Sequence, residues 1–443
     1  MQKRILLLIL SLFSLTLKGQ SDGIPSDLKC DYLENPVGID NPFPRLTWQI
    51  DDDSPGAIQS AFSILVGTDS LEVENGEGSM WHTKKIHSQQ QLVSYAGAAL
   101  QPFTKYYWKV ITWNKKNDRN ASTVYSFETG MMDIKNWQGN WISDGRDIQY
   151  KPAPCFRKQF TARNEIVSAR VYVAVAGLYE LYINGMKIGN QRLDPMYTRF
   201  DRRNFYVTHD VTTQLQQGEN AVGVILGNGW YNHQSLAVWD FEKAPWRNRP
   251  AFCLDLRITY TDGSVETISS DLSWKQSNGP IIFNSIYTGE HYDTRLKQDG
   301  WSEPGFDDTA WQKVALRAAP SQNITAQQLR PIRNVRSLPA VSFRKIDDRT
   351  YLYDFGQNMA GVTRIKVSGK EGSQLRIKHG ERLDKNGRLD LSNIDVYYRG
   401  DKENDPFQTD ILILSGKGKD EFMARFNYKG FRYVEVTGSE PVE

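Results

Sequence analysis

Several carboxylates in this sequence are spaced closely enough to act as a pair on one bond. Glu290 with Asp293 and Glu381 with Asp384 are the two pairs, and Asp354 stands in a polar turn. Two carboxylates that face one bond, about 5–5.5 Å or about 6.5–9.5 Å apart, can hydrolyse a glycosidic bond. Carboxylates in β loops more often cap turns or pair with basic side chains. We therefore assign no catalytic residue and keep Glu290 and Glu381 as candidates.

The turn with Asp354 belongs to the stretch YDFGQNMAGVTRIKV, residues 353–367. Gln357 and Asn358 add amide groups, while Gly356 and Gly361 let the backbone bend or approach a neighbour closely. Side chains of this kind satisfy backbone groups in turns. We interpret the stretch as a structural corner between two strands. The alternative is a loop that contacts a sugar or a partner domain.

Three loops combine aromatic rings with side chains that recognise hydroxyl groups. Aromatic faces hold the C–H surface of a sugar, while carboxylate, amide and guanidinium groups bond its hydroxyls. The loops are YTRFD, NGWYN and AVWDFEKAPWRNR, and their candidate carbohydrate-binding residues are Tyr197, Arg199, Asp201, Asn228, Trp230, Tyr231 and Trp239, with Asn232, Asp240, Trp246 and Arg247 nearby. The alternative is that Trp230 and Tyr231 close the end of a sandwich core.

Other chemistries find little support. The six His residues form no zinc spacing, and the glycine-rich runs lack the strand–loop–helix order of a phosphate site. The three cysteines, Cys30, Cys155 and Cys253, cannot all pair within one chain, so buried thiols and a Cys155–Cys253 disulfide both stay open. The net charge is +2 without a basic block, and we expect no nucleic-acid partner.

The first residues have the pattern of an export signal. Lys3 and Arg4 precede an apolar run from Ile5 to Leu17, which is too short for a stable membrane span. We expect a signal peptide over residues 1–20 and a periplasmic or extracellular protein. Because no second long apolar run follows, we expect no membrane span.

Short strands separated by turn signals dominate the rest of the chain. Runs of Val, Ile, Tyr, Thr and Trp alternate with polar residues, and no helical pattern exceeds two or three turns. Asn184-Gly185 and Asp262-Gly263 are typical hairpin turns, and we expect another turn at Lys429-Gly430. The pattern predicts an all-β chain of three sandwich domains, at residues 24–130, 131–320 and 321–443.

Specific stretches of the three predicted domains resemble known modules. The stretch LQPFTKYYWKVITWN resembles a fibronectin type III module. The stretches AVAGLYELYINGMKIG, LDPMYTRFDRRNFYVTHDVT, ILGNGWY, YTGEHYDTR and GWSEPGFDDTAW resemble the N-terminal sandwich of bacterial α-L-rhamnosidases. The polar turn and FNYKGFRYVEV resemble the concanavalin-like sandwich of the same family. The resemblance implies a fibronectin type III-like, a jelly-roll-like and a concanavalin-like domain, in that order.

In that family a helical barrel follows these domains and carries the catalytic carboxylates. This sequence contains no long helical pattern. The resemblance therefore implies the accessory part of a glycoside hydrolase, which is inactive alone, binds or positions rhamnose-containing glycans and supports a separately encoded catalytic barrel. A bare apolar patch on the third sandwich would favour this reading.

Two other functions stay open, together with one cofactor. The chain could be a stand-alone secreted carbohydrate-binding protein, or a self-sufficient glycosidase that uses Glu290 or Glu381. Some rhamnose-binding modules similar to the second sandwich hold calcium, so the resemblance implies a structural Ca²⁺ as a candidate cofactor. Asp201 and Asn228 are the candidate oxygen ligands.

Overall fold

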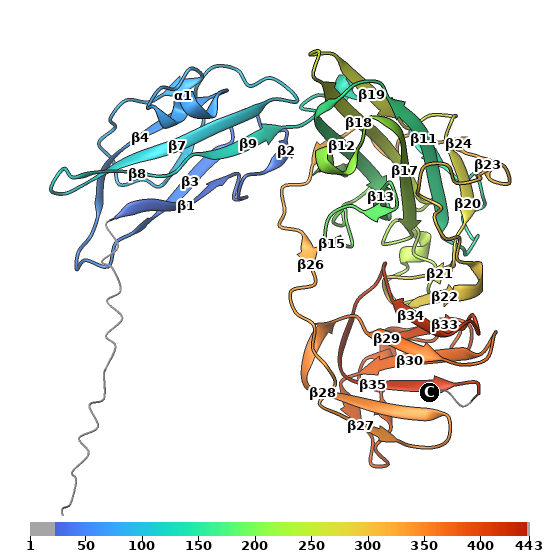
Figure 1. The fold of residues 1–443 in the computed structure, drawn as a ribbon. Helices are drawn as coiled ribbons and strands as arrows, with labels where there is room; N and C mark the ends of the chain where they lie inside the picture. The colour runs from blue at the N-terminus through green and yellow to red at the C-terminus, as the bar shows by residue number, and fades with distance from the viewer. Residues whose placement is uncertain (1–22, 441–443) are drawn as a thin grey trace, which may run out of the picture. The chain divides into compact units, whose positions relative to one another are not determined.

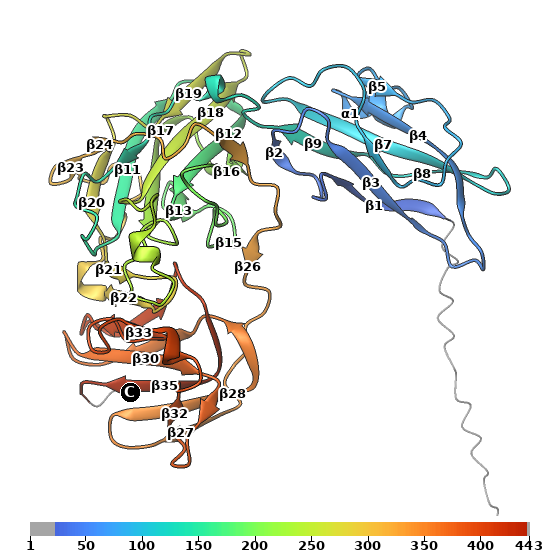
Figure 2. The same ribbon diagram turned by 180° about the vertical axis from the view of Figure 1, so that it is seen from behind.

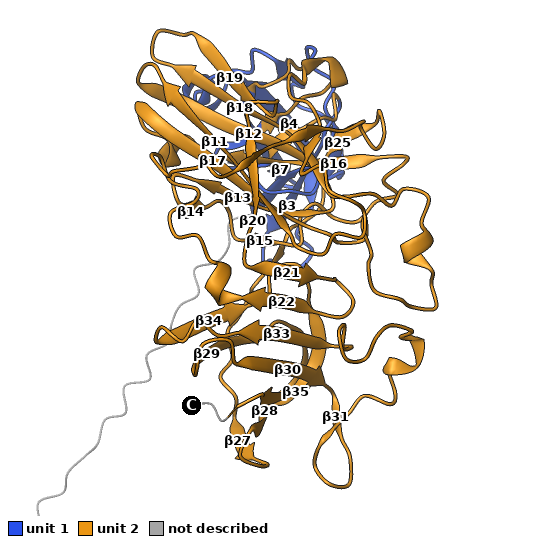
Figure 3. Cartoon of the chain, turned by 90° about the vertical axis from the view of Figure 1, so that its right-hand side faces the viewer, with its two compact units in different colours: residues 1–36, 43–99, 105–127 blue, residues 37–42, 100–104, 128–443 orange. Residues whose placement is uncertain are grey.

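The computed structural model describes residues 23–440, and the expected signal peptide lies outside them. The chain divides into two compact units (Figure 3). Unit 1 comprises residues 1–36, 43–99 and 105–127, and unit 2 comprises residues 37–42, 100–104 and 128–443. Strands build both units, which confirms the predicted all-β class, and α1 (Ser70–Glu74) is the one α-helix among the described residues. No helix within residues 23–440 is long and apolar enough to cross a membrane.

Unit 1 is a sandwich of two sheets. One sheet contains, in order, β1 (Ile24–Cys30), β3 (Arg45–Asp51) and β6 (Leu92–Ser94). The other contains β9 (Tyr125–Thr129), β7 (Lys105–Asn114), β4 (Gln59–Gly67) and β5 (Trp81–His82), and β8 (Arg119–Ala121) pairs with β7. Trp48 of β3 packs on Phe62 of β4 with 5.3 Å between ring centroids, so large aromatic side chains join the two sheets.

The first sandwich of unit 2 also has two sheets. One contains, in order, β24 (Ala315–Leu316), β10 (Ile142–Ser143), β18 (Ala251–Tyr260), β12 (Ile166–Ala176), β16 (Asn204–Asp210) and β25 (Ile324–Ala326), with β19 (Val265–Ser269) beside β18. The other contains β14 (Met186–Lys187), β13 (Leu178–Ile183), β17 (Gly218–Gly227), β11 (Pro154–Ala162), β20 (Lys275–Asn278) and β23 (Gln312–Lys313). We call this sandwich the second sandwich of the chain.

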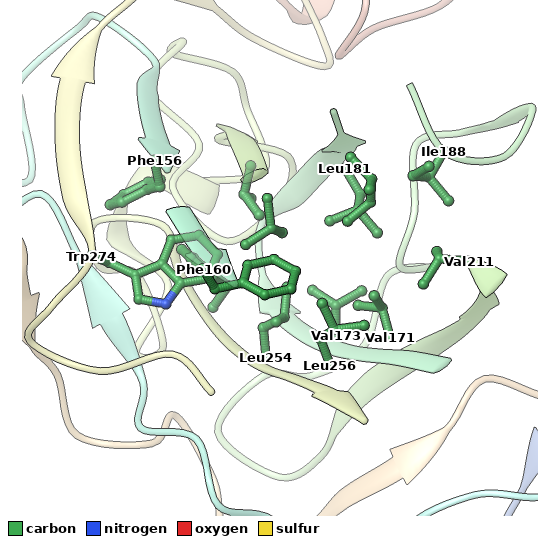
Figure 4. Close-up of a cluster of buried hydrophobic side chains, with 14 of the residues drawn as sticks. Phe156, Phe160, Val171, Val173, Leu181, Ile188, Val211, Leu254, Leu256 and Trp274 are labelled. Atoms are coloured by element: carbon green, nitrogen blue, oxygen red, sulfur yellow. The ribbon is translucent and has the colours of Figure 1, made fainter. Parts of the chain in front are cut away.

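The core of the second sandwich follows the predicted alternation. Val171, Val173 and Val175 of β12 point to one face and are fully buried. Figure 4 shows Val171 and Val173 beside Leu254 and Leu256 of the neighbouring strand. Apolar side chains from both sheets fill this layer, which removes them from water.

Turn chemistry closes the β13–β14 hairpin as predicted. Asn184 and Gly185 have φ angles of 50° and 82°, which a two-residue hairpin turn requires and which these residue types tolerate. Asp262-Gly263 likewise joins β18 to β19, with φ of 78° at Gly263. Both positions confirm the prediction from residue type.

The third sandwich lies in the lower part of Figures 1 and 2. Its large sheet contains, in order, β21 (Ile281–Asn284), β22 (Glu290–Asp293), β33 (Thr409–Ile413), β30 (Gln374–Gly380), β35 (Lys429–Gly438), β28 (Thr350–Gly361) and β27 (Ser342–Lys345). The antiparallel pair of β29 (Arg364–Ser368) and β34 (Lys419–Met423) contributes the facing layer. Short pairs join β15 (Gln191–Arg192) to β26 (Ile332–Arg333) and β31 (Arg382–Leu383) to β32 (Leu389–Asp390).

The strand β2 (Val37–Ile39) pairs in parallel with the end of β9, where Val37 lies opposite Glu128. The remaining regular elements are short 3₁₀ turns, namely η1 (Ile134–Asn136), η2 (Thr212–Gln214), η3 (Phe241–Lys243), η4 (Thr294–Leu296) and η5 (Asp395–Tyr397).

The large sheet of the third sandwich extends into residues expected for the second domain. β22 pairs in parallel with β33, with His291 opposite Ile411. The expected division at residue 320 places β21 and β22 in the second domain by sequence, whereas hydrogen bonding places them in the sheet of the third. We call the region where the second sandwich meets this sheet the seam.

The expected turn at Lys429-Gly430 is wrong. Both residues begin β35, where Gly430 lies opposite Ala360 and Lys429 opposite Gly361 of β28. The chain turns earlier, between the end of β34 at Met423 and the start of β35. The buried Lys429 ammonium bonds Asp410, and this long-range contact overrides the local turn preference of a Lys-Gly pair.

Candidate carbohydrate-binding surface and partner groove

The loop NGWYN is mostly buried, because its amides and rings hold the end of the second sandwich together. Asn228 donates from its backbone N–H to Asn284 Oδ1 at 2.7 Å and from Nδ2 to Asn284 O at 2.9 Å. Its Oδ1 accepts from Asn232 Nδ2 at 3.2 Å. Tyr231 is buried in an aromatic and aliphatic cluster, and Trp230 packs against the same cluster. These contacts close the end of the second sandwich, as in the alternative that the sequence left open for Trp230 and Tyr231. We call this buried loop the plug of the sandwich.

The other two predicted loops meet this plug on its outer side. Tyr197 is half-exposed and lies 6.3 Å from Trp230 and 6.4 Å from Trp246, measured between ring centroids. Trp246 Nε1 also donates to Trp230 O at 3.2 Å. The fold thus brings together residues that the sequence only placed in separate loops.

Trp239 lies on an exposed apolar surface. Its ring stacks on Tyr397 at 5.7 Å and meets Tyr287 edge-on at 5.3 Å. Trp239 and Tyr397 are 49% and 51% exposed, so both rings keep a free face. Leu236, Val238 and Val396 are exposed beside them. We call these five residues (Leu236, Val238, Trp239, Val396, Tyr397) the aromatic surface; it can stack on the C–H face of a sugar.

Asp201 and Asn228 do not fit a calcium site. Arg199 holds the carboxylate of Asp201 from Nε at 3.0 Å and from Nη2 at 3.3 Å. Asn228 Oδ1 is the acceptor for Asn232, and Asn228 is buried among its partners. Within residues 23–440, no group of three or more His, Cys, Asp or Glu side chains is placed to hold a metal ion. Calcium needs six to eight oxygen ligands, which these two residues do not gather.

Glu290 is a buried structural carboxylate of the seam. It is 0% exposed, and its Oε2 accepts from the backbone N–H groups of Arg425 and Phe426, each at 3.1 Å. Burial raises the pKa of Glu290 to about 7, although the nearby Arg425 guanidinium acts in the opposite direction. A glycosidic bond cannot reach a side chain without exposed surface. Asp293 forms a bidentate pair with Arg295 at 2.9 and 2.7 Å.

The second carboxylate pair also has structural partners. Glu381 Oε1 accepts from Asn358 Nδ2 at 2.9 Å, which ties it to the polar corner. Asp384 Oδ1 accepts from the backbone N–H groups of Asn386 and Arg388 at 2.8 and 2.9 Å and so caps a turn. These contacts do not arrange Glu381 and Asp384 as an acid and a base that face one bond.

The stretch YDFGQNMAGVTRIKV forms a corner within β28. The register against β35 shifts between Asp354 and Met359, and Gly356 takes a φ of 76°. Asp354 accepts from Gly356 N–H at 2.7 Å and from both Nε and Nη2 of Arg432 at 2.9 Å. The Arg432 guanidinium lowers the pKa of the Asp354 carboxyl. The polar side chains therefore hold the bend of the strand.

A groove of about 780 Å³ opens beside this corner. An extended segment, residues 332–338, forms one side, and β28, β29 and β34 form the other. Figures 1 and 2 show the segment around β26 running from the second sandwich to the third. Val335 is 95% exposed and Tyr428 is also exposed, and both line the groove. Val341 and Phe343 are exposed further along the chain, outside its lining. We call this region the partner groove.

The partner groove has a basic rim. Residues 327–345 contain Arg330, Arg333, Arg336, Arg344 and Lys345 and no Asp or Glu. Arg333 interacts electrostatically with Asp194, while Arg330 and Arg336 form no ion pair with another described residue. Exposed apolar side chains next to positive charge are typical of a surface that binds another protein.

The three cysteines are free and buried, so the alternative of a Cys155–Cys253 disulfide is not realised. Burial raises the pKa of the Cys155 thiol to about 12, which removes the thiolate needed for nucleophilic chemistry.

The fold and these surfaces define a chain of consecutive β-sandwiches with exposed aromatic and apolar surfaces and no assembled catalytic pair among its described residues. Three family models match it: the Rha78A-like N-terminal immunoglobulin domain at residues 25–133, the alpha-L-rhamnosidase N-terminal domain at residues 164–336, and the bacterial alpha-L-rhamnosidase concanavalin-like domain at residues 344–443. The chain belongs to the bacterial α-L-rhamnosidase family and consists of its N-terminal, non-catalytic domains.

Individual relatives agree with this assignment. An α-L-rhamnosidase of Formosa agariphila is 32% identical over 474 residues, covering 98% of this chain and 48% of that protein. The solved α-L-rhamnosidase from Dictyoglumus thermophilum has 36% identity and a TM-score of 0.85, covering 95% of this chain and 48% of that one. The Aspergillus terreus enzyme has 30% identity and a TM-score of 0.82, covering 93% of this chain and 46% of that one. The chain therefore spans about half the length of these relatives.

Proposed function

We propose that this chain is the accessory part of an α-L-rhamnosidase, which supports a helical catalytic domain and positions rhamnose-containing glycans for it. The partner groove is the observation that carries this proposal. Exposing Val335 and Tyr428 in the groove to water is unfavourable, and an apolar partner surface would remove that cost. The arginines on the rim predict that the partner presents acidic residues there.

The aromatic surface supports the glycan-positioning part of the proposal. Trp239 and Tyr397 offer ring faces, while the candidates Tyr197, Arg199 and Asp201 are at least partly exposed on the second sandwich. Stacking on such rings favours sugars with apolar C–H faces. Export of the chain to the periplasm or cell exterior, where such glycans are met, belongs to the same proposal and depends on residues 1–20.

The test uses three measurements on the purified chain. The chain alone should release no chromophore from an aryl α-L-rhamnoside. The part of the Dictyoglumus relative that this chain does not match, where the proposal places the helical domain, should bind the chain when purified separately. Its rhamnosidase activity should rise with chain concentration to a plateau. Val335→Asp should weaken this effect at least tenfold. Val167→Asp is the matched control, because Val167 is an exposed valine of β12 in the second sandwich.

Each opposite result has a distinct meaning. Rapid turnover by the chain alone, lost in Glu381→Gln, would make it a self-sufficient glycosidase. Glycan binding without any effect on the helical domain would instead favour a stand-alone carbohydrate-binding protein, the second function supported by the aromatic surface.

A further inference from the structure

A small pocket lies at the seam, and none of the residues that the sequence suggested for sugar binding lines it. Its volume is about 180 Å³. Four buried apolar side chains form its floor, namely Ala153, Cys155, Ile225 and Ile281. Aromatic rings form its walls, and Arg425 supplies a cationic group. An apolar pocket with a few convergent polar groups is the usual form of a small-molecule site.

The aromatic wall is rigid. The Trp301 ring lies on Gly223 of β17 so closely that a Cβ atom at position 223 would stand 2.6 Å from it. Trp301 stacks on Trp311 at 6.2 Å with an interplanar angle of 14°, and Tyr182 meets it edge-on at 5.3 Å. Because residue 223 is glycine, the Trp301 ring can pack directly against the sheet. This contact fixes one side of the aromatic wall.

A buried arginine clamps the loop that carries Trp301. Arg157 is 1% exposed; its Nε donates to Trp301 O at 2.9 Å and its Nη2 to Glu303 O at 3.0 Å. Arg157 also pairs with Asp308 further along the loop. A wall held in this way needs no reordering when a ligand enters, which lowers the entropic cost of binding.

The polar end of the pocket is close to electrically balanced. Arg425 Nε lies 3.2 Å from Glu180 Oε2, and Arg425 Nη1 lies 3.9 Å from Glu290 Oε1. Lys187 also pairs with Glu180, and at the rim Lys297 pairs with Asp299 at 2.9 Å. The Arg425 guanidinium also hydrogen-bonds the Tyr182 and Tyr292 side chains. A neutral ligand with hydroxyl groups fits such a site better than an anion, because Glu180 already neutralises the guanidinium.

We propose that this pocket binds one neutral deoxy-hexose ring, stacked on the aromatic wall, with hydroxyls bonded by Arg425 and the methyl group against the apolar floor. The proposal rests on the proposed function, that the chain handles rhamnose-containing glycans, and it adds a site. An apolar cavity of about 150 Å³ accommodates a benzene ring, so 180 Å³ suits one sugar ring and not two. The rest of a glycan would leave past the rim formed by Lys297 and Asp299.

The test is a titration of the full chain with methyl α-L-rhamnoside, followed by calorimetry and by NMR of the tryptophan indole N–H signals. Binding should have a dissociation constant on the order of 1 mM, since one small ring makes few contacts. The indole signals of Trp301 and Trp311 should shift, and that of Trp48 in unit 1 should not. Methyl α-L-mannoside, which carries a hydroxyl where rhamnose has hydrogen on its methyl carbon, should bind roughly tenfold more weakly, because the floor cannot bond the hydroxyl.

Two variants separate this pocket from the aromatic surface. Ala153→Leu fills the pocket from its floor without removing a contact and should weaken binding at least tenfold. Trp239→Ala removes a ring of the aromatic surface and should leave the indole shifts at the pocket unchanged. Circular dichroism and the melting temperature establish that each variant is folded, and the indole shifts of the unaltered chain decide the question if Ala153→Leu does not fold.

The outcomes distinguish the two proposals. Binding that persists in Ala153→Leu, or that shifts neither Trp301 nor Trp311, overturns the pocket and leaves glycan positioning in place. Binding lost only in Trp239→Ala assigns the sugar to the aromatic surface. No binding of rhamnoside at any concentration overturns the pocket and the glycan-positioning role together, while the role of the partner groove is tested separately by the helical domain.

Discussion

The buried ion pair between Lys429 and Asp410 offers a direct test of how the seam is held. The two atoms Lys429 Nζ and Asp410 Oδ1 are 2.7 Å apart, and the side chains are 2% and 1% exposed. Lys429 Nζ also donates to Asn427 Oδ1 at 2.7 Å, and Asp410 Oδ1 accepts from the backbone N–H of Glu290 at 2.8 Å. The pair therefore joins β35, β33 and β22 across the sheet.

Replacing Lys429 by Met keeps most of the side-chain volume and removes the charge. Burial by itself would raise the pKa of Asp410, but the Lys429 ammonium holds that pKa below its usual value. Without the ammonium, the buried carboxylate loses its closest counter-charge. Losing one partner of a buried pair costs about 3–5 kcal/mol of folding free energy. We expect a loss in that range for the third sandwich.

The assay is urea unfolding at pH 7.5, combined with hydrogen exchange of the amides in β22, β33 and β35. Exchange reports the local stability of the seam even where unit 1 unfolds separately. Lys366→Met is the matched control, because Lys366 is 60% exposed in its pair with Glu421, and its loss should cost less than about 1 kcal/mol. The double variant Lys429→Met/Asp410→Leu should recover much of the loss. A loss below about 1 kcal/mol in Lys429→Met would refute the role of the pair.

Three further predictions follow from the same contacts. Glu290→Gln should become more stable relative to the unaltered chain as pH rises. Because the pKa of Glu290 is raised to about 7, the folded chain binds more protons than the unfolded chain between about pH 4.5 and 7. The unaltered chain therefore loses up to about 3 kcal/mol of folding free energy across that window. Urea midpoints at pH 5 and pH 8 measure this, and a difference independent of pH would contradict it. Arg432→Ala should cost about 1 kcal/mol or less of folding free energy, because the paired side chains of Asp354 and Arg432 are 24% and 40% exposed. The urea midpoint should therefore fall slightly. A loss above about 3 kcal/mol would be too large for this contact. Excess EDTA should leave the melting temperature unchanged, since Asp201 and Asn228 already bond Arg199 and Asn232; a fall of several degrees, reversed by calcium, would show that a metal site had been missed.

Local patterns in the sequence predicted much of the fold. The alternation of Val171, Val173 and Val175 predicted a buried face, and Asn184-Gly185 predicted its hairpin turn, because both signals depend on neighbours in the chain. The same reasoning failed at Lys429-Gly430, where a partner 19 residues away in the sequence decided the conformation. It could not show that β21 and β22 join the third sandwich, because strand pairing over such separations has no local signal.

The candidate binding surfaces were likewise predicted from the sequence only in part. The sequence by itself determined the family, the order of the sandwiches and the aromatic loops that hold Tyr197, Trp230 and Trp239, since these depend on residue type and spacing. Only the tertiary structure decided that Glu290 is buried, that NGWYN closes a sandwich, and that Tyr182, Trp301 and Arg425 line one pocket. The only local signal for Trp301 is the pair Gly300-Trp301 after a polar run. This signal does not reveal that Trp301 and Arg425 line the same pocket. Residues so far apart meet only through packing of whole sheets, because burial of their apolar faces, and not any local preference, brings them together.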